Sequence, residues 1–177
     1  MVTTQPMDVT GDVDAVRAVV AAVPDPEIPV LSIEDLGILR DVRVDEHGRV
    51  DVTITPTYSG CPAMDTIRAD IEAALAGQGY PDVRVTLVLS PAWTTDWMTD
   101  AGKRRLREYG VAPPGQSPHH GGGGAPGGGP VVLSLSVRCP QCGSPDTREL
   151  SRFGSTACKS LWVCSSCREP FDHFKAI

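Results

Sequence analysis

Six cysteines carry most of the chemistry available to this 177-residue sequence, and the spacing of four of them predicts a metal site. Two Cys-x-x-Cys motifs, Cys139–Cys142 and Cys164–Cys167, are separated by 21 residues. Each motif places two thiolates on one side of a tight turn, and four thiolates together form a tetrahedral set that suits Zn²⁺. Because the protein fills all four positions, the site is predicted to be structural. A redox role is the weaker alternative, since one such motif would suffice for it.

Cys61 stands apart from these motifs, between a predicted strand and a predicted helix. Residues 49–55 alternate apolar and polar side chains, as a strand does. An apolar stripe at helical spacing follows: Met64, Ile67, Ile71 and Leu75. Pro62 suits the first helical position, so Cys61 is predicted at the N-cap, where N–H groups and the helix dipole lower a thiol pKa. The alternative is a small buried cysteine in a turn.

Asp25 and Glu27 lie in a proline-rigidified segment, residues 25–31, that cannot be helical. A capped turn over residues 32–35 follows and ends at Gly37. One interpretation makes all the acids of this region solvated loop and cap residues. The functional interpretation places Asp25 or Glu27 beside Cys61, as a weak metal ligand or a proton acceptor.

The order of predicted elements indicates an α/β fold for residues 1–111. A helix over residues 12–23 precedes a hairpin formed by strands 38–44 and 49–55. A crossover helix from Pro62 to Ala76 then leads to an inner, parallel strand over residues 82–89. The prediction is a small α/β sandwich with its helices on one face.

Two further features each leave two interpretations open. Trp93 and Trp97 lie in one loop, where they either plug the end of the sheet or form a partner surface. Cys158 is either a buried strand residue or a reactive thiol assisted by Lys159.

The second half of the chain is predicted to be a linker and a small metal-dependent module. Residues 112–130 include 8 glycines and 5 prolines among 19 positions, which predicts a flexible linker. Its His119 and His120 lack a fixed geometry. Residues 131–177 are too few to build a self-sufficient core, so a zinc ribbon folded by its metal is expected.

Composition excludes some classes of protein. The net charge is −6, with 10 basic and 18 acidic residues in residues 1–111 and 6 basic and 4 acidic residues in the remainder. The acidic first part argues against binding to nucleic-acid phosphates. The sequence shows no apolar run of about 20 residues and no signal peptide, so a cytoplasmic protein without a membrane partner is expected.

Several segments resemble known families. Asp25-Pro-Glu-Ile-Pro-Val30, Asp35-Leu-Gly37 and residues 55–62 together resemble the iron–sulfur cluster assembly domain family. Further segments are similar to the PaaD family, whose members belong to the ring-1,2-phenylacetyl-CoA epoxidase complex. These are residues 90–98, 107–110, 153–159 and 168–172.

The resemblance implies a non-catalytic maturation factor for aerobic phenylacetate breakdown. In that complex the oxygenase holds a di-iron site, and the reductase holds a flavin and a [2Fe–2S] cluster. Cys61 would be a transient ligand for iron or an iron–sulfur cluster, with Asp25 and Glu27 in the same loop region. One thiolate cannot hold a four-ligand cluster, so a client, a second copy of the chain or a small thiol must supply the rest. The partners implied are the reductase and oxygenase subunits, with a homodimer left open.

Three other functions remain as alternatives. A structural assembly subunit of the oxygenase would use the tryptophans and the ribbon as contact surfaces. A nucleic-acid-binding zinc ribbon is disfavoured by the small positive charge of residues 112–177. A cysteine hydrolase would need a positioned base for Cys61, and His47, the one histidine in residues 1–111, is predicted at a hairpin tip.

Overall fold

The computed structural model describes residues 13–115 and 137–175. The chain forms two compact units, Met1–Trp93 and Thr94–Ile177. Most of the predicted linker, with His119 and His120, and the first residues of the predicted ribbon, up to residue 136, lie outside the described residues.

The first unit contains a three-stranded sheet and two helices, and it confirms the predicted α/β class. Its elements are α1 (Val13–Ala21), β1 (Leu39–Val44), β2 (Val50–Ile54), α2 (Ala63–Ala76) and β3 (Val83–Leu87). Strand β2 pairs antiparallel with β1 and parallel with β3, in the order β1-β2-β3. The hairpin, the crossover helix and the parallel strand are therefore all present.

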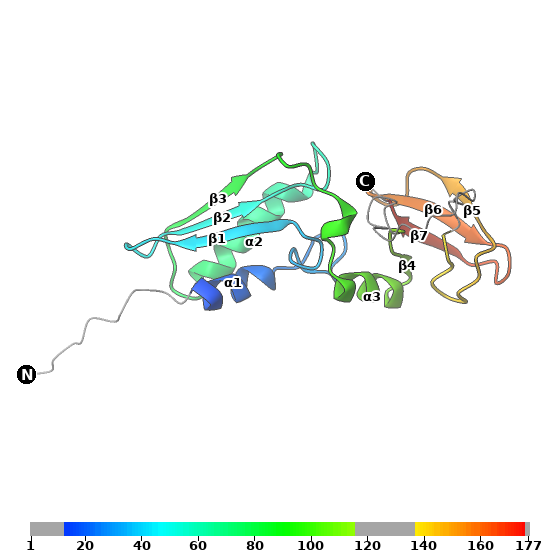
Figure 1. The fold of residues 1–177 in the computed structure, drawn as a ribbon, viewed down its shortest axis with the longest axis horizontal. Coiled ribbons are helices and arrows are strands. Elements are labelled where there is room, and N and C mark those ends of the chain that lie inside the picture. The colour runs from blue at the N-terminus through cyan, green and yellow to red at the C-terminus, as the bar shows by residue number, and fades with distance from the viewer. Residues whose placement is uncertain (1–12, 116–136, 176–177) are drawn as a thin grey trace, which may run out of the picture. The chain divides into compact units, whose positions relative to one another are not determined.

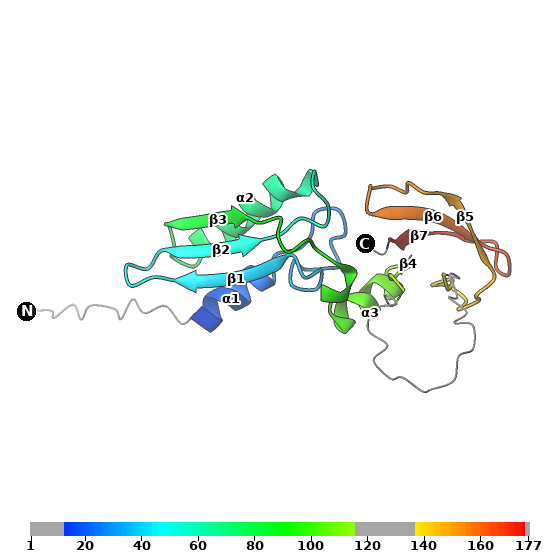
Figure 2. The ribbon, with the colours of Figure 1, turned by 45° about the horizontal axis from the view of Figure 1, so that its top comes forward.

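Alternation along β2 explains where the core lies. Its Val50, Val52 and Ile54 are fully buried, while the intervening residues are partly exposed. The helices α1 and α2 contact each other; in the view of Figure 1 α2 lies behind the sheet and α1 lies below it, and Figure 2 shows the two helices from a second angle. The apolar stripe of α2, which includes Ile67 and Ile71, covers this buried face.

Strand β3 is an edge strand, so the prediction of an inner strand over residues 82–89 was wrong. The crossover through α2 returns the chain to the side of β2, and β2 takes the central place. Leu87, the last residue of β3, is 39% exposed, and Leu89, two residues beyond the strand, is 59% exposed. The β-branched composition of β3 indicates a strand without revealing this position.

The second unit contains a short helix and a four-stranded sheet. After the 3₁₀ turn Thr95–Trp97 its elements are α3 (Asp100–Glu108), β4 (Val111–Ala112), β5 (Thr147–Ser151), β6 (Lys159–Cys164) and β7 (Pro170–Phe174). The sheet order is β4-β7-β6-β5. Because β4 pairs with β7, α3 and β4 belong with the cysteine-rich unit, whereas the sequence predicted a first domain ending at residue 111. Within the described ranges, no helix is long and apolar enough to span a bilayer.

Candidate metal centres

Cys61 lies in the loop that joins β2 to α2. The helix begins at Ala63, and Pro62 takes the N-cap position with helical angles, φ −69° and ψ −17°. Cys61 therefore precedes the cap by one residue, although it remains at the start of the helix. The local geometry follows from Pro62, whose fixed φ prepares the chain for the first turn.

Burial raises the pKa of the Cys61 thiol, which contradicts the expectation of a lowered value. The N–H of Ala63 lowers this pKa, but the charges of Glu27 and Asp25 raise it, and the side chain of Thr57 lowers it again. Removal from water and two carboxylates outweigh the N–H at the helix start. A thiol in this state stays protonated at neutral pH until a metal displaces its proton.

The loop containing Asp25 is held by hydrogen bonds to its carboxylate. Asp25 is 6% exposed, and its Oδ1 accepts the N–H groups of Glu27, at 2.9 Å, and Ile28, at 2.8 Å. Asp25 is thus a buried turn residue and not a solvated one. The charges of Glu27 and Asp25 both raise the pKa of Cys61, so two carboxylates and a thiol lie in one region.

The neighbouring acids have structural partners instead. The N–H of Asp35 donates to Ser32 Oγ at 3.1 Å, and the N–H of Ser32 donates to Asp35 Oδ2 at 3.2 Å. This reciprocal capping matches the turn that the sequence predicts. Glu34 forms an ion pair with Arg17, at 3.1 Å.

Thr57 is the residue of this site that the sequence did not single out. It is 7% exposed, and its side chain hydrogen-bonds to the Cys61 thiol. A threonine four residues before a cysteine carries no distinctive signal, since the contact depends on the bend of the loop. With Thr57 included, the region offers one sulfur and several oxygen donors, a set that can accept a borderline metal such as iron.

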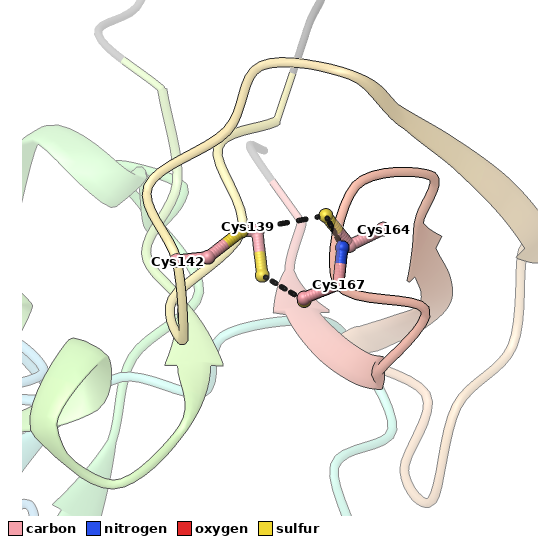
Figure 3. A group of neighbouring side chains, drawn as sticks. All are labelled: Cys139, Cys142, Cys164 and Cys167. Atoms are coloured by element: carbon pink, nitrogen blue, oxygen red, sulfur yellow. Dashed lines mark hydrogen bonds between the residues drawn. The ribbon is translucent and has the colours of Figure 1, made fainter.

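The second centre is the group of four cysteines in the C-terminal unit. Cys139 and Cys142 come from the loop before β5, whereas Cys164 ends β6 and Cys167 lies in the turn between β6 and β7, so the two pairs face each other (Figure 3). The Sγ atoms are 3.7 Å apart for Cys139 and Cys167 and 3.5 Å apart for Cys142 and Cys164. All four sulfurs lie within 4.8 Å of one another.

These separations fit a single tetrahedral metal ion. A Zn–S bond of about 2.3 Å implies neighbouring sulfurs about 3.8 Å apart at the corners of a tetrahedron. In an iron–sulfur cluster each cysteine can bind a different iron atom, which would spread the sulfurs further. The donor set therefore fits one tetrahedral, thiolate-binding metal ion such as Zn²⁺, and it leaves no ligand position for a substrate.

Each Cys-x-x-Cys motif forms a tight turn, called a knuckle here, and the two knuckles have matching backbone geometry. The N–H of Gly143 donates to the carbonyl of Cys139, and the N–H of Arg168 donates to the carbonyl of Cys164, both at 2.9 Å. The N–H of Cys167 points at Cys164 Sγ, at 3.5 Å, and lowers the pKa of that thiol to about 6. Backbone donors aimed at sulfur stabilise a thiolate, which is the form that binds metal.

Of the two interpretations of Trp93 and Trp97, the structure contradicts the partner surface for Trp93 and favours the plug. Its side chain is 4% exposed, and its Nε1–H donates to the carbonyl of Leu36 at 2.9 Å. Trp93 therefore packs within the first unit, as the plug interpretation predicts. Trp97 is half-buried in the 3₁₀ turn.

Cys158 is a buried residue, but it lies in the turn just before β6 and not in the strand itself. Its Sγ is 3.0 Å from Thr156 Oγ1, and the residue is 5% exposed. The neighbouring Lys159 directs its Nζ to Asp172 Oδ2, at 3.9 Å. The thiol is thus enclosed, and the ammonium group expected to activate it is paired with a carboxylate.

In comparisons with known proteins, two family models match separate parts of the chain. A family model described as an iron–sulfur cluster assembly protein matches residues 13–89, and one described as a PaaD zinc beta ribbon domain matches residues 130–175. A protein of Escherichia coli (strain K12), provisionally named as one of the subunits of 1,2-phenylacetyl-CoA epoxidase, is 49% identical over 166 residues, which cover 93% of each chain.

Other relatives match about half of the chain. An Fe-S protein maturation auxiliary factor of Porphyromonas gingivalis is 39% identical over 83 residues, covering 46% of this chain and 78% of its own length. The crystal structure of a domain of unknown function, DUF59, from Bacillus anthracis has 30% identity and a TM-score of 0.50, covering 53% of this chain and 90% of that one. The resemblances seen in the sequence are confirmed.

Proposed function

Because the chain belongs to the PaaD family of 1,2-phenylacetyl-CoA epoxidase subunits, we propose that it is a non-catalytic accessory protein that helps to assemble a metal centre of that complex. Its cargo is iron or an iron–sulfur cluster, held transiently by Cys61. Its clients are the reductase or oxygenase subunits. The relatives named as Fe-S protein maturation auxiliary factors, which align with 46% of this chain, support this role.

The observation that carries the proposal is the environment of Cys61. Its thiol is half-buried, and two carboxylates and the Thr57 side chain act on it. Burial and negative charge keep the proton on sulfur, so the thiol has little tendency to react with oxidants before cargo arrives. A metal ion displaces that proton, and Glu27 or Asp25 supplies a nearby acceptor and an oxygen ligand.

The count of ligands explains why cargo would leave again. One thiolate and two carboxylates do not satisfy a four-ligand cluster, so the remaining positions must come from a client, a second copy or a small thiol. When client thiolates replace Cys61, the client releases its protons and Cys61 regains one. Incomplete ligation thus favours delivery over storage.

The zinc ribbon has a separate role in this proposal. Its four cysteines fill a tetrahedron with no open position, so it supplies a rigid docking module and no chemistry. The metal ion joins the two Cys-x-x-Cys motifs around a small buried cluster of Ala112, Cys139, Cys164 and Phe171.

Anaerobic metal analysis tests the assignment of Cys61 directly. The full-length protein is reconstituted with iron and sulfide, and its iron, sulfide, zinc and absorption spectrum are compared with those of Cys61→Ser and Ser59→Ala. Ser59 is exposed in the same loop, so its variant controls for disturbance of the loop. The expected result is loss of iron in Cys61→Ser alone, with zinc unchanged in all three proteins. Equal iron content in the wild type and Cys61→Ser would refute the assignment.

A further inference from the structure

A cavity of about 390 Å³ lies on one face of the ribbon sheet. Four of its lining residues are brought together by strand register. Ser160 pairs with His173 across β6 and β7, and Glu149 pairs with Trp162 across β5 and β6. Residues that oppose each other in an antiparallel pair share a face, as do residues two apart in one strand. The same face carries Cys164 and Phe171 further along, so the cavity and the metal-dependent core are built on one surface.

Aromatic side chains form the walls of this cavity. Trp162 packs against the buried cluster that includes Cys139 and Cys164, and it also lines the cavity. Phe153 is 72% exposed, and Lys175 Nζ lies 5.1 Å from the centre of its ring. The fold gains little from a phenylalanine that stays in water, so this ring is available to be covered by an occupant.

A chain of hydrogen bonds fixes the polar part of the cavity. Trp162 Nε1–H donates to Ser160 Oγ at 2.9 Å, and Ser160 Oγ lies 3.3 Å from His173 Nδ1. Ser160 is 3% exposed, so its hydroxyl proton needs an acceptor, and His173 Nδ1 provides one. The proton of a neutral His173 is then on Nε2, which leaves an N–H donor on a residue that lines the cavity. Burial lowers the pKa of His173 to about 4 and keeps the ring neutral.

Charge favours an anionic occupant. Arg152 and Lys175 line the cavity against the single carboxylate of Glu149. Lys175 Nζ donates to the carbonyl of Arg152 at 3.2 Å, which holds the ammonium group beside the opening. Residues 94–177 carry ten basic and seven acidic residues, whereas residues 1–93 carry six basic and 15 acidic residues. An acidic partner is therefore attracted to the ribbon and repelled by the other unit.

We propose that this cavity docks an acidic segment of a client protein, with an aromatic or large apolar side chain inserted between Trp162 and Phe153 and a neighbouring carboxylate held by Arg152 and Lys175. The cavity is open to solvent, which suits one side chain of an extended segment better than an enclosed small molecule. This inference rests on the proposed function, because it names the surface by which the accessory protein holds its client.

The test uses the full-length, zinc-loaded protein and a defined probe. The probe is a capped hexapeptide of alternating glutamate and phenylalanine, titrated while the indole N–H of Trp162 is followed by NMR. A peptide with lysine in place of glutamate is the matched comparison. We expect saturable shifts at Trp162 with the acidic peptide, weakened by added salt, and binding at least about tenfold weaker for the lysine peptide.

Variants distinguish binding in the cavity from binding that any basic or apolar surface residue would support. Arg152→Glu and Phe153→Ala should each weaken binding of the acidic peptide about tenfold. Arg148→Glu and Tyr109→Ala, which change an exposed arginine and an exposed aromatic ring outside the cavity, should leave it within about twofold. Equal binding of both peptides, no binding at about 1 mM peptide, or insensitivity to Arg152→Glu and Phe153→Ala would overturn the proposal.

The readouts also separate this inference from the proposed function. Cys61→Ser should bind the acidic peptide as the wild type does, because the cavity lies wholly within the second unit. If the peptide binds as expected but Cys61→Ser loses no iron, the metal role of Cys61 fails and the docking site stands. If Cys61 behaves as proposed but the cavity variants bind normally, the docking site alone is wrong.

Discussion

Gly143 and Arg168 hold the same position in the two cysteine knuckles, each following the second cysteine with a left-handed φ, 75° for Gly143 and 65° for Arg168. The matching N–H bonds to Cys139 and Cys164 explain why both knuckles demand this conformation. Glycine adopts it at little cost, whereas a side chain costs about 1–2 kcal/mol. One knuckle is thus relaxed and the other is strained.

The first prediction exploits this asymmetry. Gly143→Ala should lower the free energy of unfolding of the zinc-loaded ribbon by about 1–2 kcal/mol, since a Cβ at φ 75° is strained even where space is open. Arg168→Gly should be neutral or stabilising by about 0.5 kcal/mol, because relief of strain is offset by the entropy of glycine. Thermal unfolding of the two variants measures both effects. A free energy of unfolding of Gly143→Ala equal to that of the wild type would show that the two knuckles do not share this backbone conformation.

Removal of the metal should unfold one unit and spare the other. A strong chelator is expected to abolish amide protection in β5, β6 and β7, because the small cluster around Cys139 and Phe171 cannot hold the sheet alone. Protection in β2 and α2 should persist, since their core does not involve the cysteine group. Hydrogen exchange read by mass spectrometry distinguishes the units. Retained protection in β6 after complete loss of zinc would contradict a metal-dependent ribbon.

The parts of the fold that could be predicted are those that depend on local pattern. Alternation in Val50, Val52 and Ile54 predicted a strand, helical spacing from Met64 to Leu75 predicted a helix, and paired Cys-x-x-Cys motifs predicted a four-sulfur site. Each is a property of a short segment that tertiary context did not override.

The parts that could not be predicted depend on contacts between distant segments. The carbonyl of Leu36 that binds Trp93 is 57 residues away, so no local rule could decide between a plug and a partner surface. The direction of the Cys61 pKa shift was missed because it depends on burial and on the charges of Glu27 and Asp25. The cavity on the ribbon, whose residues span positions 149–175, becomes visible only through strand register.

His173 should make the ribbon less stable in mild acid. Its pKa is lowered from 6.5 to about 4 in the folded protein, so between these values the unfolded chain binds a proton that the folded chain does not. The resulting destabilisation is absent above about pH 6.5, grows as the pH falls and is complete below about pH 4, where it is on the order of 3 kcal/mol. His173→Gln should flatten this part of the stability profile relative to the wild type, as measured by denaturation from pH 7 to 4.5. Superimposable profiles would exclude His173 as the cause.

Two substitutions of Asp25 separate its structural role in the turn from the role of its charge. Asp25→Asn keeps a side-chain oxygen that can accept the N–H groups of Glu27 and Ile28, so the first unit should lose less than about 1 kcal/mol. Asp25→Ala leaves those buried donors without that acceptor and should cost about 1–3 kcal/mol. Denaturant unfolding provides the measurement. If Asp25 is also a metal ligand, Asp25→Asn should lower the iron content of the reconstituted protein with little change in its free energy of unfolding. A loss of stability without a loss of iron would assign Asp25 to the turn only.

The cluster content of the client tests the central proposal most directly. The reductase of the epoxidase complex is co-expressed with the wild-type chain, with Cys61→Ser or with Ser59→Ala, and iron and acid-labile sulfide are measured per reductase molecule after purification. The account predicts a reductase depleted of its cluster with Cys61→Ser and fully loaded with the other two. A reductase loaded equally in all three cases, while Cys61→Ser is confirmed as folded, would contradict the account.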